Sequence, residues 1–285
     1  MKSFLDWGRK LGLVGGLVVG TLLVSSLQVW ALTKEQVIER LRTVPVFTLA
    51  NGEGSPLLAV PTQGESRMPI ASVFINRDDA QKFLDDLKTR DPQTAQGISV
   101  VPVPLAKIYE YEVAQQTKAE TEQVRFAFFP DAQQVEAAKA LLQQQGQSQQ
   151  FEGVPLFVAK ENGQEGGYLT IQQGADQVIP MFFEQSELQT LLTRLREVQP
   201  NMATSVQMQV VNLEGVINTL QTSNNEELNR IVLVPSQQSR EFIRSLQGQQ
   251  GAGQGAGQPA SGGTAPAARP QAQPASPQAQ PARPR

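Results

Sequence analysis

The feature that most constrains the fold of this chain is a pattern that occurs twice in its sequence. The segment Val44–Phe47 (VPVF) recurs as Val154–Phe157 (VPLF), and an Asn-Gly pair follows each copy. The run 73–109 then matches the run 181–217 without a gap. The positions kept in both copies are apolar or proline: Phe74 and Phe182, Leu84 and Leu192, Leu87 and Leu195, Pro92 and Pro200, Leu105 and Leu213. Because hardly any reactive side chain is kept, the pattern indicates a duplicated scaffold rather than a duplicated catalytic set.

The absence of histidine and cysteine narrows the function classes further. Without histidine the chain lacks the usual general base at neutral pH and the commonest metal ligand. Without cysteine it has no thiol nucleophile, zinc–thiolate site or disulfide. An enzyme would have to use carboxylate, lysine, serine, threonine or tyrosine chemistry, and no such constellation is evident in the sequence. We therefore expect a protein that is not an enzyme and has no metal or cofactor.

The two ends of the chain differ from its middle. Lys2, Arg9 and Lys10 precede an apolar run from 11 to 27, and V-W-A at 29–31 fits a signal-peptidase site. This layout predicts an export signal over 1–31 that is cleaved after Ala31. The alternative is an uncleaved anchor, because the run approaches the roughly 20 residues that span a bilayer. Residues 247–285 consist mainly of Gln, Pro, Ala and Gly, a composition that predicts a disordered tail.

The segment between leader and tail is acidic. Residues 32–246 carry 18 basic and 26 acidic side chains, a net charge of −8. Phosphate binding depends on clustered Lys and Arg. The charge therefore argues against nucleic acid as a partner, and against adhesion to anionic lipid through this segment.

Turn residues and apolar spacing predict the same order of elements in both halves. Each half should contain a hairpin at its Asn-Gly pair, a third strand, an amphipathic helix ended by proline, a strand, a helix, a strand and a last helix. The expected hairpin strands are 44–49 with 57–60 and 156–160 with 168–171, and the expected third strands are 71–75 and 179–183. Thr33 to Gln36 fits a capping box before the first hairpin, and Asp78 and Ser186 are the expected N-caps of the proline-ended helices.

These elements predict an α+β fold made of two tandem repeats related by a pseudo-twofold axis. Each repeat should be a mixed sheet with amphipathic helices on one face. We expect residues 32–246 to form a single globular domain whose repeats cover about 32–142 and 151–246. Two such sheets leave concave surfaces beside the axis.

Other patterns have simpler interpretations. Asp78-Asp79 and Asp85-Asp86 could suggest a Ca²⁺ site, but adjacent helical positions diverge and a solvated helix face is favoured. The glycines at 163, 166 and 167 lack the order of a phosphate loop and indicate a turn. Phe126 and Phe128 should face one side of a strand and Phe129 the other. A strand covered on both faces and a ligand-contacting surface both explain these phenylalanines.

Several short segments, in order, resemble one known family. They are V-P-V-F-T-L from Val44, S-V-F-I-N-R-D-D-A from Ser72, V-P-V-P-L-A-K-I-Y from Val101 and F-V-A-K-E-N-G from Phe157. Together they resemble the Tic-twenty-two-like proteins, the small soluble intermembrane-space components of the chloroplast inner-envelope translocon and their cyanobacterial relatives. The resemblance covers roughly Leu32 to Leu246. It implies a pseudo-twofold α+β fold with hydrophobic pockets, a chaperone-like role in moving precursors between two membranes, and no catalytic residues. A bacterial-type signal in place of a transit peptide, and the Gln/Pro/Ala/Gly tail, point to a cyanobacterial periplasmic protein.

The function expected from these observations is that of a non-enzymatic periplasmic chaperone in protein transport. Its partners would be unfolded precursor or outer-membrane proteins, together with translocon components, and it could associate peripherally with a membrane. The alternative is a scaffold or adaptor that docks a folded translocon or outer-membrane partner. The alternative locations are the thylakoid lumen, to which the same kind of export signal directs proteins, and the intermembrane space.

Equivalent apolar positions of the two repeats are the expected client contacts. They are the strand openings and the strands beside proline: Val46, Phe47, Val101, Val103, Leu156, Phe157 and Val211. The other interpretation is that these side chains are core, because buried strands have the same pattern.

Overall fold

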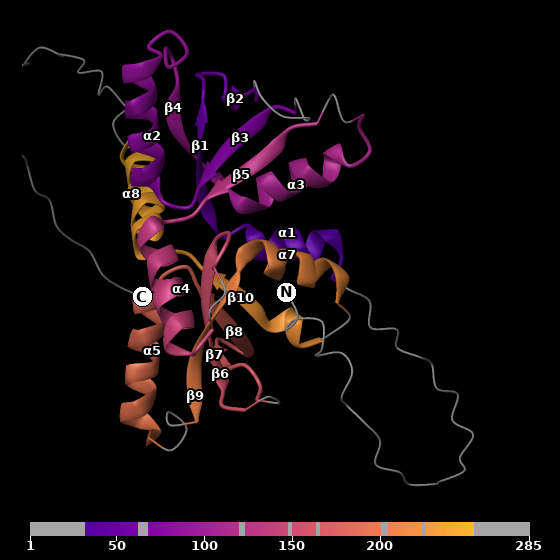
Figure 1. The fold of residues 1–285 in the computed structure, drawn as a ribbon, viewed down its shortest axis with the longest axis vertical. Helices are drawn as coiled ribbons and strands as arrows, with labels where there is room; N and C mark the ends of the chain where they lie inside the picture. Colours follow the sequence, from indigo (N-terminus) through magenta and orange to yellow (C-terminus); the bar gives the residue numbers. More distant parts are fainter. Residues whose placement is uncertain are drawn as a thin grey trace, which may run out of the picture. The chain divides into compact units, whose positions relative to one another are not determined.

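The first half of the chain contributes one five-stranded sheet and the second half another in the computed structural model (Figure 1). The structure describes residues 32–61, 68–119, 123–147, 150–163, 166–200, 205–223 and 226–253. The strands of the first sheet are β1 Pro45–Ala50, β2 Leu58–Ala59, β3 Ile70–Phe74, β4 Ser99–Pro104 and β5 Arg125–Phe129. The strands of the second sheet are β6 Pro155–Glu161, β7 Ile171–Gln173, β8 Asp176–Phe182, β9 Val206–Asn212 and β10 Ile231–Val234.

The two sheets pair their strands in the same way. In the first, β1 lies between β3 and β4 in antiparallel pairings, and β5 pairs with β3 in parallel. In the second, β6 lies between β8 and β9 in antiparallel pairings, and β10 pairs with β8 in parallel. The registers also correspond, since Phe47 pairs with Phe74 and Phe157 pairs with Phe182. The predicted α+β class with mixed sheets is confirmed at this level.

Helices follow the strands in both halves. Their bounds are α1 Lys34–Leu41, α2 Arg77–Arg90, α3 Leu105–Gln115, α4 Ala132–Gln144, α5 Gln185–Val198, α7 Leu213–Thr222 and α8 Gln237–Gly253, with a 3-10 helix η3 at Glu226–Arg230. Both proline-ended helices end two residues before their proline, at Arg90 and Val198, as the restricted backbone before proline requires.

The expected helix caps are confirmed for α1 and wrong for α2 and α5. Thr33 and Gln36 form the predicted capping box. The N-cap of α2 is Asn76, whose Oδ1 accepts from the Asp78 N–H at 2.8 Å, and the N-cap of α5 is Glu184, which makes no side-chain capping bond. Both helices begin before the predicted caps, so Asp78 and Ser186 lie inside the first turn. An acidic residue there still stabilises a helix through its dipole.

The expected hairpin at Asn51-Gly52 is a longer loop. The positive φ is at Gly54 (82°) rather than Gly52, and Asn51 Oδ1 accepts from the N–H groups of Glu53 and Ser55 at 3.0 and 2.9 Å. This Asx-type turn replaces the two-residue turn. As a result β2 forms its ladder with β3, whereas an isolated bridge joins Ala50 to Pro56. In the second half the predicted hairpin pairing is present as an antiparallel bridge between Lys160 and Tyr168 and a bond from the Leu169 N–H to the Ala159 carbonyl at 2.9 Å, whereas β7 forms its ladder with β8.

The inner strands are buried on both faces, which corrects the expectation of helices on one face. Val46 and Phe47 point to opposite sides of β1, and both have no exposed surface. The largest buried cluster combines apolar residues of α1, α3 and α7 with one face of both sheets. A second cluster combines α4 and α5 with the other face of the second sheet, including Phe157, Leu188 and Leu192.

Helix α4 comes from the first half of the sequence but packs on the second sheet. It contacts β6 and β9, and its Ala138 and Leu141 belong to the cluster around Phe157. At its C-terminus the Gln145 side-chain amide donates to the Met208 carbonyl at 2.7 Å. Packing therefore joins the two halves, and neither has its full set of packing contacts alone.

The chain divides into two units after Arg240, within α8. Helix α8 extends as far as Gly253. The rest of the predicted tail and the predicted signal over 1–31 lie outside the described residues. None of the helices described has the length and apolar character needed to cross a bilayer.

Candidate functional site

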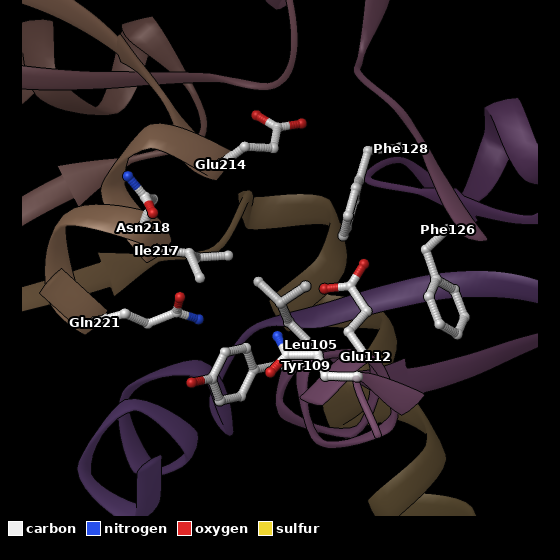
Figure 2. Close-up of a pocket in the computed structure, with 10 residues that line it drawn as sticks. Leu105, Tyr109, Glu112, Phe126, Phe128, Glu214, Ile217, Asn218 and Gln221 are labelled. Carbon is white, nitrogen blue, oxygen red and sulfur yellow. The ribbon is translucent and has the colours of Figure 1, made fainter. Parts of the chain in front are cut away.

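A pocket of about 410 Å³ lies between α3, α7 and β5 (Figure 2). Its walls combine apolar side chains with amides and two carboxylates. The lining residues are Leu105, Tyr109, Glu112, Gln116, Phe126, Phe128, Glu214, Ile217, Asn218 and Gln221. The volume is within the usual range of ligand pockets, roughly 300–1,000 Å³.

Helical periodicity brings the lining residues together. Glu214, Ile217, Asn218 and Gln221 are spaced i, i+3, i+4 and i+7 and therefore share one face of α7. On α3 the lining positions recur every three or four residues from Leu105. Figure 2 shows the α7 residues on one wall and Phe126, Phe128 and Glu112 on the other.

A backbone hydrogen bond of the same kind positions α3 and α7. The Leu105 N–H donates to the Val44 carbonyl at 2.8 Å, and the Leu213 N–H donates to the Val154 carbonyl at 2.9 Å. Each bond continues a strand ladder into the first turn of the helix that follows. The ends of β4 and β9 therefore fix where α3 and α7 begin.

Strand β5 supplies an aromatic wall. Phe126 and Phe128 are half-buried and line the pocket, which agrees with the ligand-contacting alternative for these residues. Phe129 points to the opposite face, as alternation predicts, and stacks on Phe74 with 4.8 Å between ring centroids. Tyr111 meets Phe126 edge to face at 5.5 Å, an arrangement that aromatic pairs favour.

A buried amide fixes the start of β5. Gln115, the last residue of α3, is 4% exposed. Its Nε2 donates to the Val124 carbonyl at 3.0 Å, and its Oε1 accepts from the Val124 N–H. The Gln115 side chain therefore bonds to the backbone of Val124 as a neighbouring strand would. It links β5, which carries the aromatic wall, to α3.

The polar side of the pocket is acidic. Burial raises the pKa of the Glu112 carboxyl above its ordinary value, and the negative charge of Glu214 raises this pKa further. Glu214 Oε2 lies 3.5 Å from the Val154 N–H, beside Gly153, whose φ of +85° favours glycine. A Cβ at position 153 would lie only 2.8 Å from this oxygen, so the glycine makes room for the carboxylate.

The predicted client contacts are mostly core residues in this structure. Val46, Phe47, Leu156 and Phe157 have no exposed surface, and Val211 is buried as well. Each occupies the sheet interior, where neighbouring strands and helices cover it. The exposure that a direct client contact requires is absent at these five positions, and their location agrees with the core interpretation.

Val101 and Val103 are the two predicted contacts that are half-buried. Both lie on β4, which pairs with β1 at the edge of the first sheet, as its prolines predict. The structure brings the predicted residues together within each sheet, with Val46 opposite Val103 and Leu156 opposite Val211. It does not join them into one accessible surface.

The sequence interpretation did not identify the polar residues of the pocket. Glu112, Gln116, Glu214, Asn218 and Gln221 were not predicted to share a site. A signal was present, because on α7 the polar residues follow helical spacing beside the apolar stripe of Leu213, Val216 and Leu220. Ile217 packs against the core cluster and also lines the pocket, so it lies where the core meets the pocket.

The acidic pairs of α2 form a solvated face, as the sequence favours. Asp85 Oδ1 lies 3.0 Å from Lys88 Nζ, Asp79 Oδ1 lies 3.2 Å from Lys82 Nζ, and Asp86 pairs with Arg90. In the described part of the chain, no group of three or more acidic side chains is placed to hold a metal ion.

Comparison with known proteins identifies relatives of this chain. The model of the Tic22-like family matches residues 15–245. Protein TIC 22, chloroplastic, from Pisum sativum is 24% identical over 192 residues, covering 67% of this chain and 69% of the relative. The protein of the same name from Arabidopsis thaliana is 24% identical over 218 residues, covering 76% of this chain and 72% of the relative.

Two solved structures share the fold. Anabaena Tic22, described as a protein of protein transport, is 34% identical with a TM-score of 0.65, covering 75% of this chain and 97% of its own. Tic22 from Plasmodium falciparum is 23% identical with a TM-score of 0.56, covering 75% of this chain and 98% of its own. At this identity the likeness shows the fold alone. The family match covers most of the chain, and the chain therefore belongs to the Tic22-like family.

Proposed function

We propose that this protein is a non-enzymatic chaperone of protein transport that binds apolar segments of unfolded precursors in the pocket of α3, α7 and β5. The observation that carries the proposal is the apolar wall of that pocket. Half-buried Phe126 and Phe128 of β5 and Ile217 of α7 meet the buried Leu105 and Tyr109 of α3 around one open volume. A pocket of this kind can hold a client side chain without chemistry at the site.

Two further observations support a role in transport. The chain belongs to the Tic22-like family, and the related Anabaena protein is described by its role in protein transport. The acidic charge of residues 32–246 would keep a complex with an apolar client soluble. We propose unfolded precursor or outer-membrane proteins as clients, with translocon components as further partners.

The proposed location is the periplasm of a cyanobacterium, with the thylakoid lumen or intermembrane space as the alternative. The sequence of the leader, with its basic start and V-W-A site, supports export. The matching pair registers of the two sheets support our further proposal that the halves are repeats about a pseudo-twofold axis. We also propose that residues 32–246 act as one domain, followed by a tail that serves as a solvated spacer.

The chaperone proposal can be tested by light scattering of an outer-membrane barrel protein diluted from denaturant. The wild-type chain should suppress aggregation at stoichiometric concentration. Phe126→Ala combined with Ile217→Ala should reduce suppression, because both changes remove apolar surface from the pocket.

The matched control is Phe83→Ala combined with Val198→Ala. These side chains are 39% and 78% exposed, and neither lines the pocket. Circular dichroism should show that both double variants remain folded. Equal suppression by both, or none by the wild type, would argue against the pocket. Capture of one folded partner at fixed stoichiometry would favour the scaffold alternative.

A further inference from the structure

The pocket combines apolar walls with two carboxylates and has no basic side chain among its lining residues. Glu112 comes from α3 and Glu214 from α7, so the two acids belong to different helices. In Figure 2 Glu214 lies with the α7 wall and Glu112 beside Phe128 on the opposite wall. Within the described residues, no Lys or Arg forms an ion pair with either carboxylate.

Glu112 and Glu214 are both half-buried, and two like charges in a partly desolvated pocket repel each other. Burial and the charge of Glu214 both raise the pKa of Glu112, as expected when neither desolvation nor repulsion is compensated by a cation. The Val154 N–H is the hydrogen-bond donor placed near Glu214, at 3.5 Å. A positive group entering the pocket would be attracted to both carboxylates and would relieve their repulsion.

The other lining groups suit the rest of a basic side chain. Lysine and arginine carry an apolar stem that packs on hydrophobic surface while the charged head remains polar. Phe126 and Phe128, which are half-buried, offer aromatic surface for such a stem and for cation–π contact. Asn218 and Gln221 offer amide oxygens as additional acceptors for N–H groups.

We propose that this pocket selects client segments in which an arginine or lysine stands among apolar residues, with Glu112 and Glu214 holding the cation. The inference rests on the proposed chaperone function and specifies the class of segment that it binds. An acidic residue at the same place in a segment would be repelled by the same pair.

Fluorescence anisotropy with three labelled peptides tests this selectivity on the full chain. The peptides share an apolar sequence and differ at one central position, which is arginine, its neutral analogue citrulline, or glutamate. Wild type should bind the arginine peptide about tenfold more tightly than the citrulline peptide, equivalent to roughly 1.4 kcal/mol, and the glutamate peptide most weakly.

The double variant Glu112→Gln, Glu214→Gln should bind the arginine and citrulline peptides equally. Glu197→Gln, on the exposed side of α5, is the matched control and should keep the preference. Equal binding of both peptides by wild type, or a preference that persists in the double variant, would overturn the inference and leave the chaperone proposal intact. Failure of wild type to bind any of the three peptides would overturn both.

Discussion

The Asn76 side-chain amide donates a hydrogen bond to Asp131 Oδ2 at 2.6 Å, which joins the N-caps of two helices that are 55 residues apart. Asn76 caps α2, and Asp131 caps α4 through bonds from the N–H groups of Gln133 and Gln134. Helix α2 packs on the first sheet and α4 on the second. One hydrogen bond between caps therefore links helices that cover different sheets.

Replacing Asp131 should destabilise the protein, because this side chain caps α4 and accepts the bond from Asn76. Asp131→Ala removes the α4 cap and leaves Asn76 without its acceptor, at an expected cost of about 1–2 kcal/mol. Asp131→Asn keeps a capping oxygen and should cost less. Urea unfolding of Asp131→Ala, Asn76→Ala and the double variant measures the coupling. Strict additivity would show that the bond between the caps contributes nothing.

Truncating the central phenylalanines should affect stability strongly. Phe47 and Phe157 have no exposed surface, so Phe47→Ala or Phe157→Ala should each cost about 3–5 kcal/mol. Phe83→Ala, at a position that is 39% exposed, is the matched control and should cost clearly less. Chemical denaturation would measure all three. A small cost at both central positions would mean that they are not core.

The amide of Gln115 is expected to maintain the start of β5. Gln115→Ala leaves the N–H and C=O groups of Val124 without their partner, which should cost about 1–3 kcal/mol. Hydrogen exchange at the Val124 amide should accelerate at the same time. Gln133→Ala, on the exposed side of α4, provides the control. Unchanged exchange at Val124 would contradict the proposed role of the side chain.

The half-buried carboxyl of Glu112 should make stability depend on pH. The pKa of Glu112 is raised in the folded state, so the folded protein binds the proton of this carboxyl more tightly than the unfolded chain does. The stabilising contribution is complete below the unfolded value of about 4.3 and is lost as the pH rises through the folded value. Glu112→Gln should therefore raise the melting temperature at pH 7, and the difference should vanish at low pH. The control Glu197→Gln should show no such dependence on pH. A lower melting temperature of Glu112→Gln than of wild type at pH 7 would contradict the prediction.

Local periodicity and turn chemistry predicted most elements of the fold. The spacing of apolar residues located α2, α5 and the strands that follow them, and Thr33 with Gln36 located the start of α1. The caps of α2 and α5 were misplaced because several polar residues near a helix start can serve as caps, and the sequence does not say which is used. The packing of α4 on the second sheet was not predictable, since it depends on contacts between distant segments.

The site was harder to predict for a related reason. A fully buried strand and an apolar binding surface have the same sequence pattern, so the sequence left both interpretations open for Phe47 and Phe157, and both side chains lie in the core. The pocket requires α3, α7 and β5 to meet, although α7 is about a hundred residues away from the others in sequence. Of the pocket's aromatic wall, alternation on β5 predicted the common direction of Phe126 and Phe128.

Site-directed photocrosslinking tests the binding role of the pocket most directly. A benzophenone-bearing residue can be placed at position 126 or 221, which line the pocket, or at position 83, which does not. After addition of an unfolded outer-membrane protein, the chains carrying the probe at 126 and 221 should form crosslinks to the client, and the chain carrying it at 83 should form few. Client crosslinks from 83 with none from 126 and 221 would contradict the assignment of the binding site to this pocket.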